Sequence, residues 1–383
     1  MRVTILWQTF DSGLYSNHDF ELLYKNVGHN NGNLAFVYAI QSQIDAEITF
    51  APWHAKPEYL DEISDIVVLP CANQLGPHTK LGGLAENLSR LKTPIVGIGI
   101  GAQAKDFSQD VALDPGTLAW VQQLDAHRVD PAVSNLYTRG PYTSAQLEKL
   151  GVSGACTGGC PSHFINPDIQ LGQKIAANWN GLQHIRKVSV SAGHQSWAEV
   201  REIEQQLVGL LFDPACTGQY VVQSMTDMVK ISRGDFDSIE PEVFQRLKNH
   251  IVPHYSDSEF KAFCLNYVYS FYDVPAWMDS LRRYDLAIGP RYHGIALALQ
   301  AEKMGVVVTI DTRTEEMCQQ TGIPYIRSQD CDRPLVRSTL KSLIQFDADK
   351  YDEFRSERAR NYVNFLEANH LKPKAFLKAI AEG

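Results

Sequence analysis

One uninterrupted segment, from Tyr284 to Asp311, restricts most strongly what this chain can fold into. It opens with the short apolar run 286–288, which has charge before it and Gly289-Pro290 after it, as is typical of a buried strand in a parallel sheet. Residues 294–303 are rich in Ala and Leu and contain no helix breaker, and residues 306–310 form a second apolar run. The segment therefore predicts a strand, a helix and a further strand of an open α/β sheet.

An arginine and a histidine lie in the connection between the first of these strands and the helix. Arg291 and His293 lie at this point, followed by Gly294. Ligands of open α/β sheets bind at the carboxyl ends of strands, and a helix N-terminus favours an anion there. Arg291 offers a planar fork for phosphate or carboxylate, and His293 can exchange a proton near neutral pH. The alternative is a structural pair, with Arg291 bound to a carboxylate and His293 to a carbonyl group.

The same alternation of strand, polar edge and helix recurs along the chain. Predicted strands cover residues 2–7, 47–51, 65–69, 94–99, 135–138, 187–192, 220–223 and 325–326, besides the two above. Helical patterns cover residues 34–44, 84–91, 116–128, 197–212 and a region that begins at Pro141. Asn31 or Asn33 is expected to cap the first of these helices, and Asp311 or Thr314 the helix after residue 310. Polar residues at the predicted strand ends are therefore candidate ligand contacts, and these are Asn33, Asn73, Gln103, Arg139 and Arg313.

The length and the restart of the pattern predict two domains. A chain of 383 residues exceeds one ordinary core, and residues 159–168 are rich in turn formers before the alternation begins again. We expect an N-terminal α/β domain over residues 1–175, a C-terminal α/β domain over 176–330, and helices over 331–383 that pack back on the body. Gly97 to Ala102 formally fit a dinucleotide fingerprint, but no helix opens directly after them. We interpret these glycines as positions where the backbone closely approaches a neighbour or a ligand.

Charge and cysteine content exclude several classes of protein. The formal net charge of −9 argues against a nucleic-acid binder. Seven scattered cysteines do not suggest a disulfide framework, so we expect reduced thiols and a cytoplasmic location. Cys156, Cys160 and His163 raise the question of zinc, but a second ligand pair is missing, so we predict burial and no metal. The sequence also has no apolar run of membrane-spanning length.

Several stretches, in order, carry a resemblance to the polysaccharide pyruvyl transferase family. They are residues 30–33 (NNGN), 65–74, 94–103 (PIVGIGIGAQ), Thr138-Arg139 with Ser144, Leu147 and Gly151, and 285–294 (DLAIGPRYHG) with the strand into Asp311. The Arg-x-His-Gly block in its strand-to-helix setting is the most specific of them. The sequence departs from the usual family pattern at Asn33, where an acidic residue is common, and at Arg313, where a lysine is common.

The resemblance implies a GT-B-like fold of two tandem Rossmann-like domains with mostly parallel sheets and an active site in the cleft between them. It also implies transfer of a pyruvyl group from phosphoenolpyruvate, as donor substrate and without a further cofactor, to a sugar. The N-terminal domain would be the acceptor side and would contribute Arg139, and the C-terminal domain the donor side, with Arg291 and His293.

Within this chemistry we assign His293 as the general acid that protonates the methylene carbon, and Arg291 as the group that stabilises the departing phosphate. Arg139, Gly294, Asn33, Asn73, Gln103 and Arg313 would contact the substrates. Asp11, Asp106 and Asp311 are candidates for the base that activates the sugar hydroxyl.

Two other functions stay open at the level of the sequence. A glycosyltransferase that uses a nucleotide sugar could place Glu315 or Glu316 on the ribose. A non-catalytic sugar-binding relative is compatible with Asn33. The expected partners are a small-molecule donor and a saccharide acceptor, without nucleic acid or a transmembrane segment, and with room for peripheral association with a lipid-linked glycan.

Overall fold

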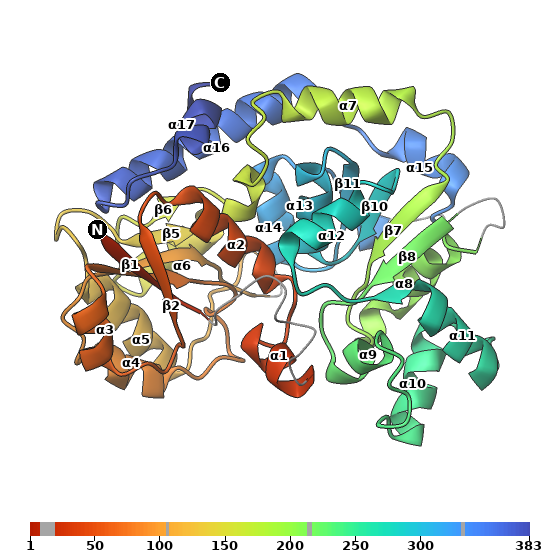
Figure 1. Ribbon diagram of the computed structural model, residues 1–383, viewed down its shortest axis with the longest axis horizontal. Coiled ribbons are helices and arrows are strands. Elements are labelled where there is room, and N and C mark those ends of the chain that lie inside the picture. The colour runs from red at the N-terminus through yellow and green to blue at the C-terminus, as the bar shows by residue number, and fades with distance from the viewer. Residues whose placement is uncertain (8–19, 105–106, 213–216, 331–333) are drawn as a thin grey trace.

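Two six-stranded parallel sheets lie side by side in the computed structural model, which describes residues 1–7, 20–104, 107–212, 217–330 and 334–383 (Figure 1). The first sheet has the strand order β2-β1-β3-β4-β5-β6 and the second has the order β12-β11-β10-β7-β8-β9. Every pairing in both sheets is parallel. The predicted α/β fold class with two parallel sheets in tandem is thus confirmed.

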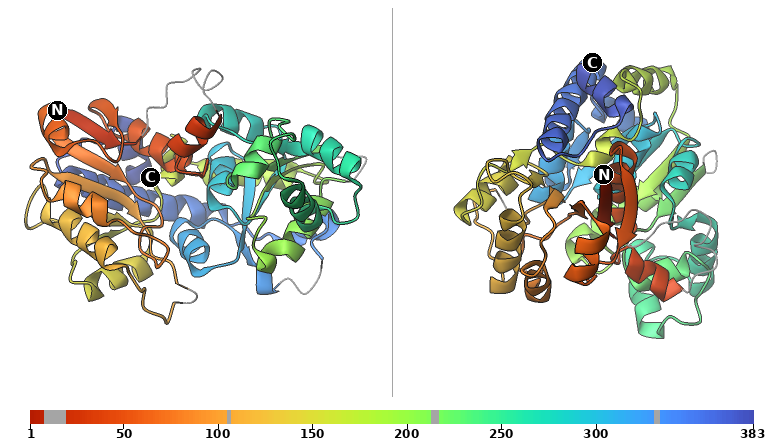
Figure 2. Two further views of the ribbon diagram at one scale, coloured as in Figure 1. Left: turned by 90° about the horizontal axis from the view of Figure 1, so that it is seen from below. Right: turned by 60° about the vertical axis from the view of Figure 1, so that its left-hand side comes forward.

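The strands of the first sheet are β1 (Arg2–Leu6), β2 (Glu47–Ala51), β3 (Ile66–Pro70), β4 (Ile95–Ile100), β5 (Leu136–Thr138) and β6 (Cys156–Thr157). Those of the second sheet are β7 (Lys187–Ser191), β8 (Thr217–Val221), β9 (Val268–Tyr269), β10 (Leu286–Gly289), β11 (Met304–Thr309) and β12 (Tyr325–Arg327). Strands β3, β4, β10 and β11 are buried along their whole length, since helices cover both faces of each sheet (Figure 2).

The helices of the first half are α1 (Phe20–Asn26), α2 (Asn33–Gln43), α3 (Pro57–Ile63), α4 (Gly82–Leu88), α5 (Pro115–Ala126), α6 (Pro141–Lys149) and α7 (Leu171–Gly181). Those of the second half are α8 (Arg201–Gly209), α9 (Thr226–Ile231), α10 (Pro241–Ile251), α11 (Asp257–Tyr267), α12 (Val274–Leu281), α13 (Tyr292–Gln300), α14 (Thr312–Thr321), α15 (Arg337–Leu343), α16 (Ala348–Ala368) and α17 (Ala375–Glu382). Short 3₁₀ helices cover Pro161–Phe164, Ala198–Val200 and Ser328–Asp330.

The start of α2 differs from the prediction. The N-cap is Gly32, without a side-chain cap, and Asn33 is the first helical residue. Asn31 instead donates its side-chain N–H to the Phe271 carbonyl oxygen at 2.9 Å, and its backbone N–H to the Gln223 carbonyl oxygen at 2.9 Å. The expected cap was wrong because the Asn31 amide joins the two halves of the molecule. At α14, Asp311 is the cap, as one of the two predicted alternatives.

The helices at the end of the chain return to the first sheet (Figure 1). The Tyr362 and Phe365 rings of α16 lie 4.9 and 5.2 Å from the Tyr137 ring of β5, measured between centroids. Beyond α16, the Lys372 carbonyl oxygen accepts from the Asp45 N–H at 2.8 Å. The predicted domain boundaries stay predictions, but the tail clearly packs on the body of the molecule.

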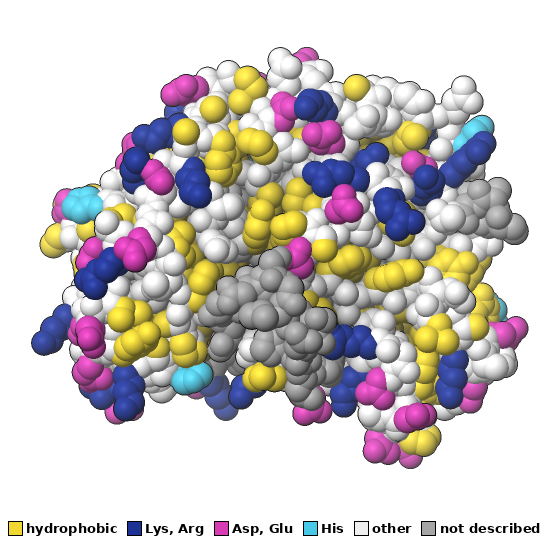
Figure 3. Space-filling model, viewed as in Figure 1, with side chains coloured by type: hydrophobic (Ala, Val, Ile, Leu, Met, Phe, Trp, Pro, Cys, Tyr) yellow, Lys and Arg dark blue, Asp and Glu magenta, His cyan; other side chains and the backbone are white. Residues whose placement is uncertain are grey.

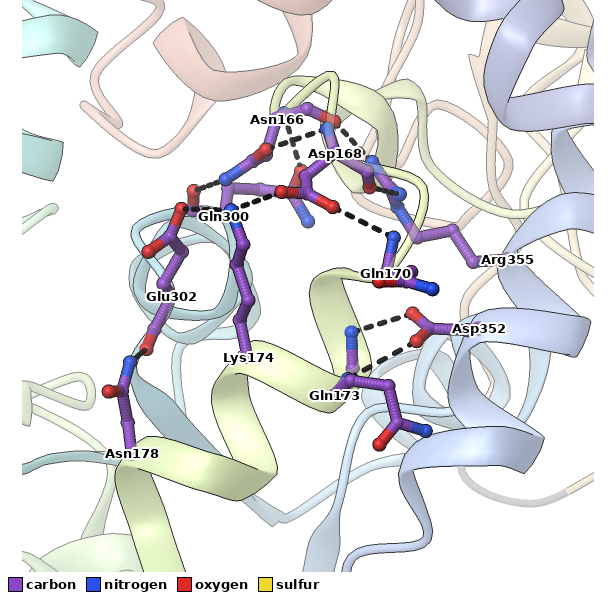
Figure 4. A network of polar contacts seen from close by, with 11 residues as sticks. Asn166, Asp168, Gln170, Gln173, Lys174, Asn178, Gln300, Glu302, Asp352 and Arg355 are labelled. Atoms are coloured by element: carbon purple, nitrogen blue, oxygen red, sulfur yellow. Dashed lines mark hydrogen bonds and ion pairs between the residues drawn. The ribbon is translucent and has the colours of Figure 1, made fainter. Parts of the chain in front are cut away.

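A polar network fixes the segment that joins the two sheets (Figure 4). Arg355 of α16 is fully buried and donates to the carbonyl oxygens of His163 at 3.1 Å, Asp168 at 2.6 Å and Asn166. Asn166 also donates its backbone N–H to Gln300 Oε1 and its side-chain N–H to the Gln300 carbonyl oxygen, both at 2.9 Å, at the end of α13. The connection is therefore held by both the tail and the second domain.

The surface carries both signs of charge. Figure 3 shows Lys and Arg side chains scattered among Asp and Glu on the viewed face. None of the helices within the described ranges is long and apolar enough to span a lipid bilayer.

Candidate functional site between the two sheets

Three arginines and one histidine from both sheets share one electrostatic environment. Arg139 follows β5, Arg291 and His293 follow β10, and Arg313 follows β11. Burial is the main cause that lowers the pKa of His293 well below its usual value, and the positive charges of Arg139, Arg313 and Arg291 lower it further. The charge of Arg313 also depresses the pKa of Arg139 and of Arg291. The structure thus brings together Arg139, Arg291, His293 and Arg313, which were predicted from three different strand ends.

Arg139 is buried between α2 and the glycine-rich strand β4. Its Nε donates to the Gly99 carbonyl oxygen at 2.8 Å and its Nη2 to that of Cys71 at 3.4 Å. The guanidinium carbon lies 5.7 Å from the centroid of the Phe36 ring. A Cβ at Gly101 would lie 3.0 Å from Arg139 Cδ and 3.1 Å from the Ala72 carbonyl oxygen, so glycine allows a close approach here. The interpretation of these glycines as points of close approach therefore fits the structure.

Arg291 lies directly before α13, where it is the N-cap residue without a side-chain cap. Its Nη2 donates to Ser224 Oγ at 2.5 Å, and its carbonyl oxygen accepts from Ser191 Oγ at 3.0 Å. Burial lowers the pKa of Arg291 to about 10, with the Arg313 charge as the next cause, while Glu204 acts in the opposite direction. Even so, the guanidinium stays charged at neutral pH.

His293 is 8% exposed and packs against the first domain. Its ring centroid lies 5.5 Å from that of Phe36, and its Nε2 lies 3.6 Å from Cys160 Sγ. On the other side, a Cβ at Gly32 would lie 3.3 Å from its Nδ1. Because the pKa is depressed, the imidazole is neutral near pH 7. This environment differs from the expectation that His293 exchanges a proton near neutral pH.

Gly294 has a packing role in the first turn of α13. A Cβ there would lie 2.5 Å from Ser191 Oγ and 3.0 Å from Gln223 Nε2. Those two side chains are hydrogen-bonded to each other at 2.8 Å. The glycine therefore lets the helix N-terminus approach the ends of β7 and β8.

Arg313 and the acidic residues around it are tied into α14 and α6. Arg313 Nη2 lies 3.3 Å from Asp311 Oδ2, and Asp311 also accepts from Thr314 N–H at 2.8 Å. Glu316 is buried and accepts from the Tyr142 N–H at 2.7 Å, at the N-terminus of α6. Glu315 forms an ion pair of 2.6 Å with Arg327. Since both glutamates have partners, neither is free to bind a ribose, which disfavours the nucleotide-sugar alternative.

Asn33, Asn73 and Gln103 lie on the first domain, beside this cationic cluster. Asn33 donates to the Val27 carbonyl oxygen at 3.0 Å, and the Asn73 amide donates to Gln103 Oε1. Asn33 and Asn73 line a cavity of about 450 Å³ at the carboxyl ends of β1, β2 and β3. Arg139, Arg291 and His293 do not line this cavity. The predicted contact residues are therefore divided between the cationic cluster and the neighbouring cavity.

Within the described ranges, no group of three His, Cys, Asp or Glu side chains is placed to hold a metal ion, and Cys156, Cys160 and His163 do not form one. Of the three candidate bases, Asp311 already caps α14 and contacts Arg313. Asp11 and Asp106 lie outside the described residues.

Several residues of the site were not predicted from the sequence. Cys160 and Phe36 enclose His293, Ser224 holds Arg291, and Glu316 holds the turn after Arg139. Ser224 follows a predicted strand end, and this position is a signal that could have been used. Cys160, Phe36 and Glu316 are distant in sequence from the residues they contact, so only the tertiary structure reveals them.

The fold and the site define a two-domain α/β protein that gathers positive charge from both sheets, as suits an anionic substrate. A family model described as polysaccharide pyruvyl transferase matches residues 10–312, and the chain belongs to this family. Family membership indicates a transferase with a general role in pyruvyl transfer.

Among solved structures, the chain is similar to Anabaena Alr3699/HepE in complex with UDP and glucose, at 12% identity and TM-score 0.43, over 100% of this chain and 98% of that one. It is also similar to S. aureus MnaA in complex with UDP, at 10% identity and TM-score 0.43, over 99% and 94%. A third is UDP-GlcNAc 2-epimerase from Methanocaldococcus jannaschii, at 10% identity and TM-score 0.40, over 85% and 89%. None of these likenesses is close enough to carry over an activity. No curated protein gives a significant sequence match.

Proposed function

We propose that the protein transfers a pyruvyl group from phosphoenolpyruvate to a pair of hydroxyl groups on a sugar unit of a glycan or glycan precursor, with formation of a pyruvate ketal. The observation that carries the proposal is the cationic cluster of Arg139, Arg291 and Arg313 around the neutral His293. In the described part of the chain, the contacts of Arg139 and Arg291 are neutral oxygen atoms, so no contacting carboxylate cancels their charges. A small ligand with a phosphate and a carboxylate fits this surplus of positive charge.

The reaction needs a proton at the methylene carbon, which leaves the adjacent carbon electron-poor. One sugar hydroxyl adds to that carbon and gives up its proton, and the second hydroxyl displaces phosphate. His293 would be the acid. Burial and the three arginine charges depress its pKa, and a bound dianion would offset those charges and raise the pKa towards neutrality. Arg291 would stabilise the phosphate as it departs.

Ligand-dependent unfolding tests the donor. Phosphoenolpyruvate should raise the melting temperature of the protein, whereas UDP and CMP should not. Arg291→Ala should weaken phosphoenolpyruvate binding by about 10-fold or more, since a hydrogen bond to a charged group contributes roughly 1.5–3 kcal/mol. The matched control is Arg282→Ala, an exposed arginine at the end of α12. Stabilisation by UDP instead of phosphoenolpyruvate would contradict the proposal.

Turnover is tested by phosphate release with and without added glycans. Phosphate release that depends on an added glycan would exclude the alternative of a non-catalytic sugar-binding protein. His293→Ala should abolish release while it leaves donor binding largely intact, and the exposed His184→Ala should behave as wild type. Normal turnover by the His293→Ala protein would show that another group is the acid.

A further inference from the structure

The cavity of about 450 Å³ has a wall built from the ends of three strands. Trp7 follows β1, Trp53 follows β2 and Asn73 follows β3, while Asn33 comes from the start of α2. Parallel strands bring their carboxyl ends to one edge of a sheet, so residues far apart in sequence meet here. The volume lies in the range of small-molecule sites, about 300–1,000 Å³, and suits the end of a glycan.

The walls combine flat aromatic rings with polar groups. The Trp7 and Trp53 ring centroids are 6.3 Å apart at an interplanar angle of 75°. Trp7 is 7% exposed and Trp53 is half-buried. Indole faces pack against the C–H faces of sugar rings, while their N–H groups donate to hydroxyl groups. Aromatic rings beside amide and hydroxyl groups suit a saccharide better than a purely apolar ligand.

Four lining residues carry a buried polar atom that has no hydrogen-bond partner in the described part of the chain. These atoms are Trp7 Nε1, Trp53 Nε1, Asn73 Oδ1 and Thr79 Oγ1. Buried polar groups in native proteins are nearly always paired, so four unpaired atoms around one cavity call for a physical reason. A ligand rich in hydroxyl groups, bound along these walls, would supply the missing partners.

The described lining of the cavity carries one fixed charge, the ammonium group of Lys25, and none of the described lining residues is acidic. The cavity also adjoins the cationic cluster. Arg139 donates to the Cys71 carbonyl oxygen, and the next residue, Ala72, lines the cavity. An ammonium group moved from water into such a site would lose hydration without gaining a counter-charge.

We propose that this cavity is the acceptor subsite, and that it accepts a neutral, N-acetylated or acidic sugar unit and rejects one with a free amino group. That the bound sugar is the acceptor of the reaction rests on the proposed function. Saccharide binding and its charge preference can be measured without turnover. The position of Asn33, one residue from the Gly32 backbone that packs against His293, places the cavity next to the transfer site.

A glycan array probed with the full-length protein tests the charge preference through matched pairs that end in N-acetylglucosamine or in glucosamine. At neutral pH, the N-acetylated member of each bound pair should bind at least 10-fold more tightly. Trp53→Ala should weaken binding by 10-fold or more, whereas Tyr59→Ala, an exposed aromatic residue on α3, should not. Equal or tighter binding of the free-amine member, unchanged binding by Trp53→Ala, or binding to no glycan would overturn the proposal.

A charge reversal at the rim provides a variant that keeps the core intact. Lys25 is exposed near the end of α1, so Lys25→Glu should fold normally and reduce the preference for N-acetylated over free-amine glycans by several fold. Lys92→Glu makes the same change in net charge before β4, at the opposite edge of the first sheet, and should leave the preference unchanged. An equal effect of both variants would contradict a local origin of the selectivity.

Parallel melting measurements with phosphoenolpyruvate separate the two proposals. If glycan binding fails and phosphoenolpyruvate still stabilises the protein, the subsite assignment is wrong and the donor assignment stands. If glycans bind and phosphoenolpyruvate does not, the proposed reaction is wrong and the saccharide site stands.

Discussion

His293 is the residue whose chemistry depends most on its neighbours. The sequence alone placed it, with Arg291 and Gly294, at the N-terminus of a helix, and the structure has it in the first turn of α13. Arg139 and Arg313 were predicted from other strand ends by the same argument. Cys160 and Ser224 could not be paired with their partners in advance, because their contacts depend on how the chain closes in three dimensions.

The depressed pKa of His293 predicts that donor binding takes up a proton. In the free protein the imidazole is neutral above its lowered pKa, and a bound dianion raises that pKa. Between the free and bound pKa values the complex holds one more proton, so affinity should increase as pH falls through this window. Calorimetry in buffers of different ionisation enthalpy measures the uptake. His293→Gln should remove it, and uptake that persists unchanged in this variant would refute the assignment.

The two arginines that flank the histidine should differ when each is replaced by lysine. Arg139 is 3% exposed and donates to two backbone carbonyl oxygens, whereas Arg291 donates to the Ser224 side chain. Lysine keeps the charge but loses the planar fork. Arg139→Lys should therefore lower the free energy of unfolding by roughly 1–3 kcal/mol, and Arg291→Lys by less. Urea denaturation compares them, and equal losses would argue against the structural role of Arg139.

At the scale of elements, α14 of the second domain holds the N-terminus of α6 in the first. Glu316 accepts from the Tyr142 N–H at 2.7 Å, the Thr143 N–H at 3.3 Å and Thr143 Oγ1 at 3.2 Å. A Cβ at Gly140 would overlap the Glu316 carboxyl group, so the turn after Arg139 is shaped around this contact. A carboxylate at a helix N-terminus is favoured by the free N–H groups and the helix dipole.

Substitutions at Glu316 should separate the contributions of its shape and of its charge to the free energy of unfolding. Glu316→Gln keeps an acceptor oxygen, so its cost should be about 1 kcal/mol, whereas Glu316→Ala leaves buried N–H groups unpaired and should cost about 3 kcal/mol or more. Glu315→Ala removes an ion pair with the exposed Arg327 and an exposed hydrogen bond from Gln319, and it should cost less than about 1 kcal/mol. Denaturant titration of the three variants checks the order, and equal losses at both positions would contradict the contact.

Most elements were predictable because buried parallel strands are apolar runs bounded by turn residues. Strand β2 matches its predicted bounds, β1 ends one residue earlier than predicted, and β3 and β4 are each shifted by one residue at both ends. Strands β6 and β9 were missed because two residues are too short to show a pattern. The helix predicted over residues 197–212 is a 3₁₀ turn followed by the shorter α8. Helices α3 and α7 were also missed, since they lie in segments with mixed turn signals.

For the whole molecule, buried neutral histidines predict sensitivity to acid. Burial is the main cause that lowers the pKa of His250 to about 4, and it holds the pKa of His163 well below its usual range. The unfolded chain takes up these protons near pH 6.5 and the folded chain only at lower pH, so the unfolded state binds more protons in between. The free energy of unfolding should fall as pH decreases from about 6.5 to about 4.

Each such histidine contributes up to about 1.4 kcal/mol per pH unit within its window. His250→Leu should therefore give a shallower dependence of the urea midpoint on pH. His184→Leu, at an exposed position, should leave the slope of the wild type. A slope that is unchanged in the His250→Leu protein would rule out this source of acid sensitivity.

The number and type of the two sheets followed from the sequence, but their internal order and relative placement did not. Apolar periodicity identifies strands without stating which strands pair. Contacts such as Asn31 with Phe271, and Glu316 with Tyr142, decide how the domains meet. They use polar groups that look like ordinary loop or helix residues in the sequence.

The return of α16 to the first sheet makes that domain discontinuous, with the second domain as an insertion between its two parts. The stacked rings of Phe164 and Tyr362, 5.9 Å apart, belong to segments on either side of this insertion. A fragment that ends before α16 would keep both sheets but expose the aromatic side chains around Tyr137 to water. We expect this fragment to aggregate. The segment from α7 to α15 contains every strand of the second sheet. Removal of this segment should therefore be tolerated better than removal of α16 and α17.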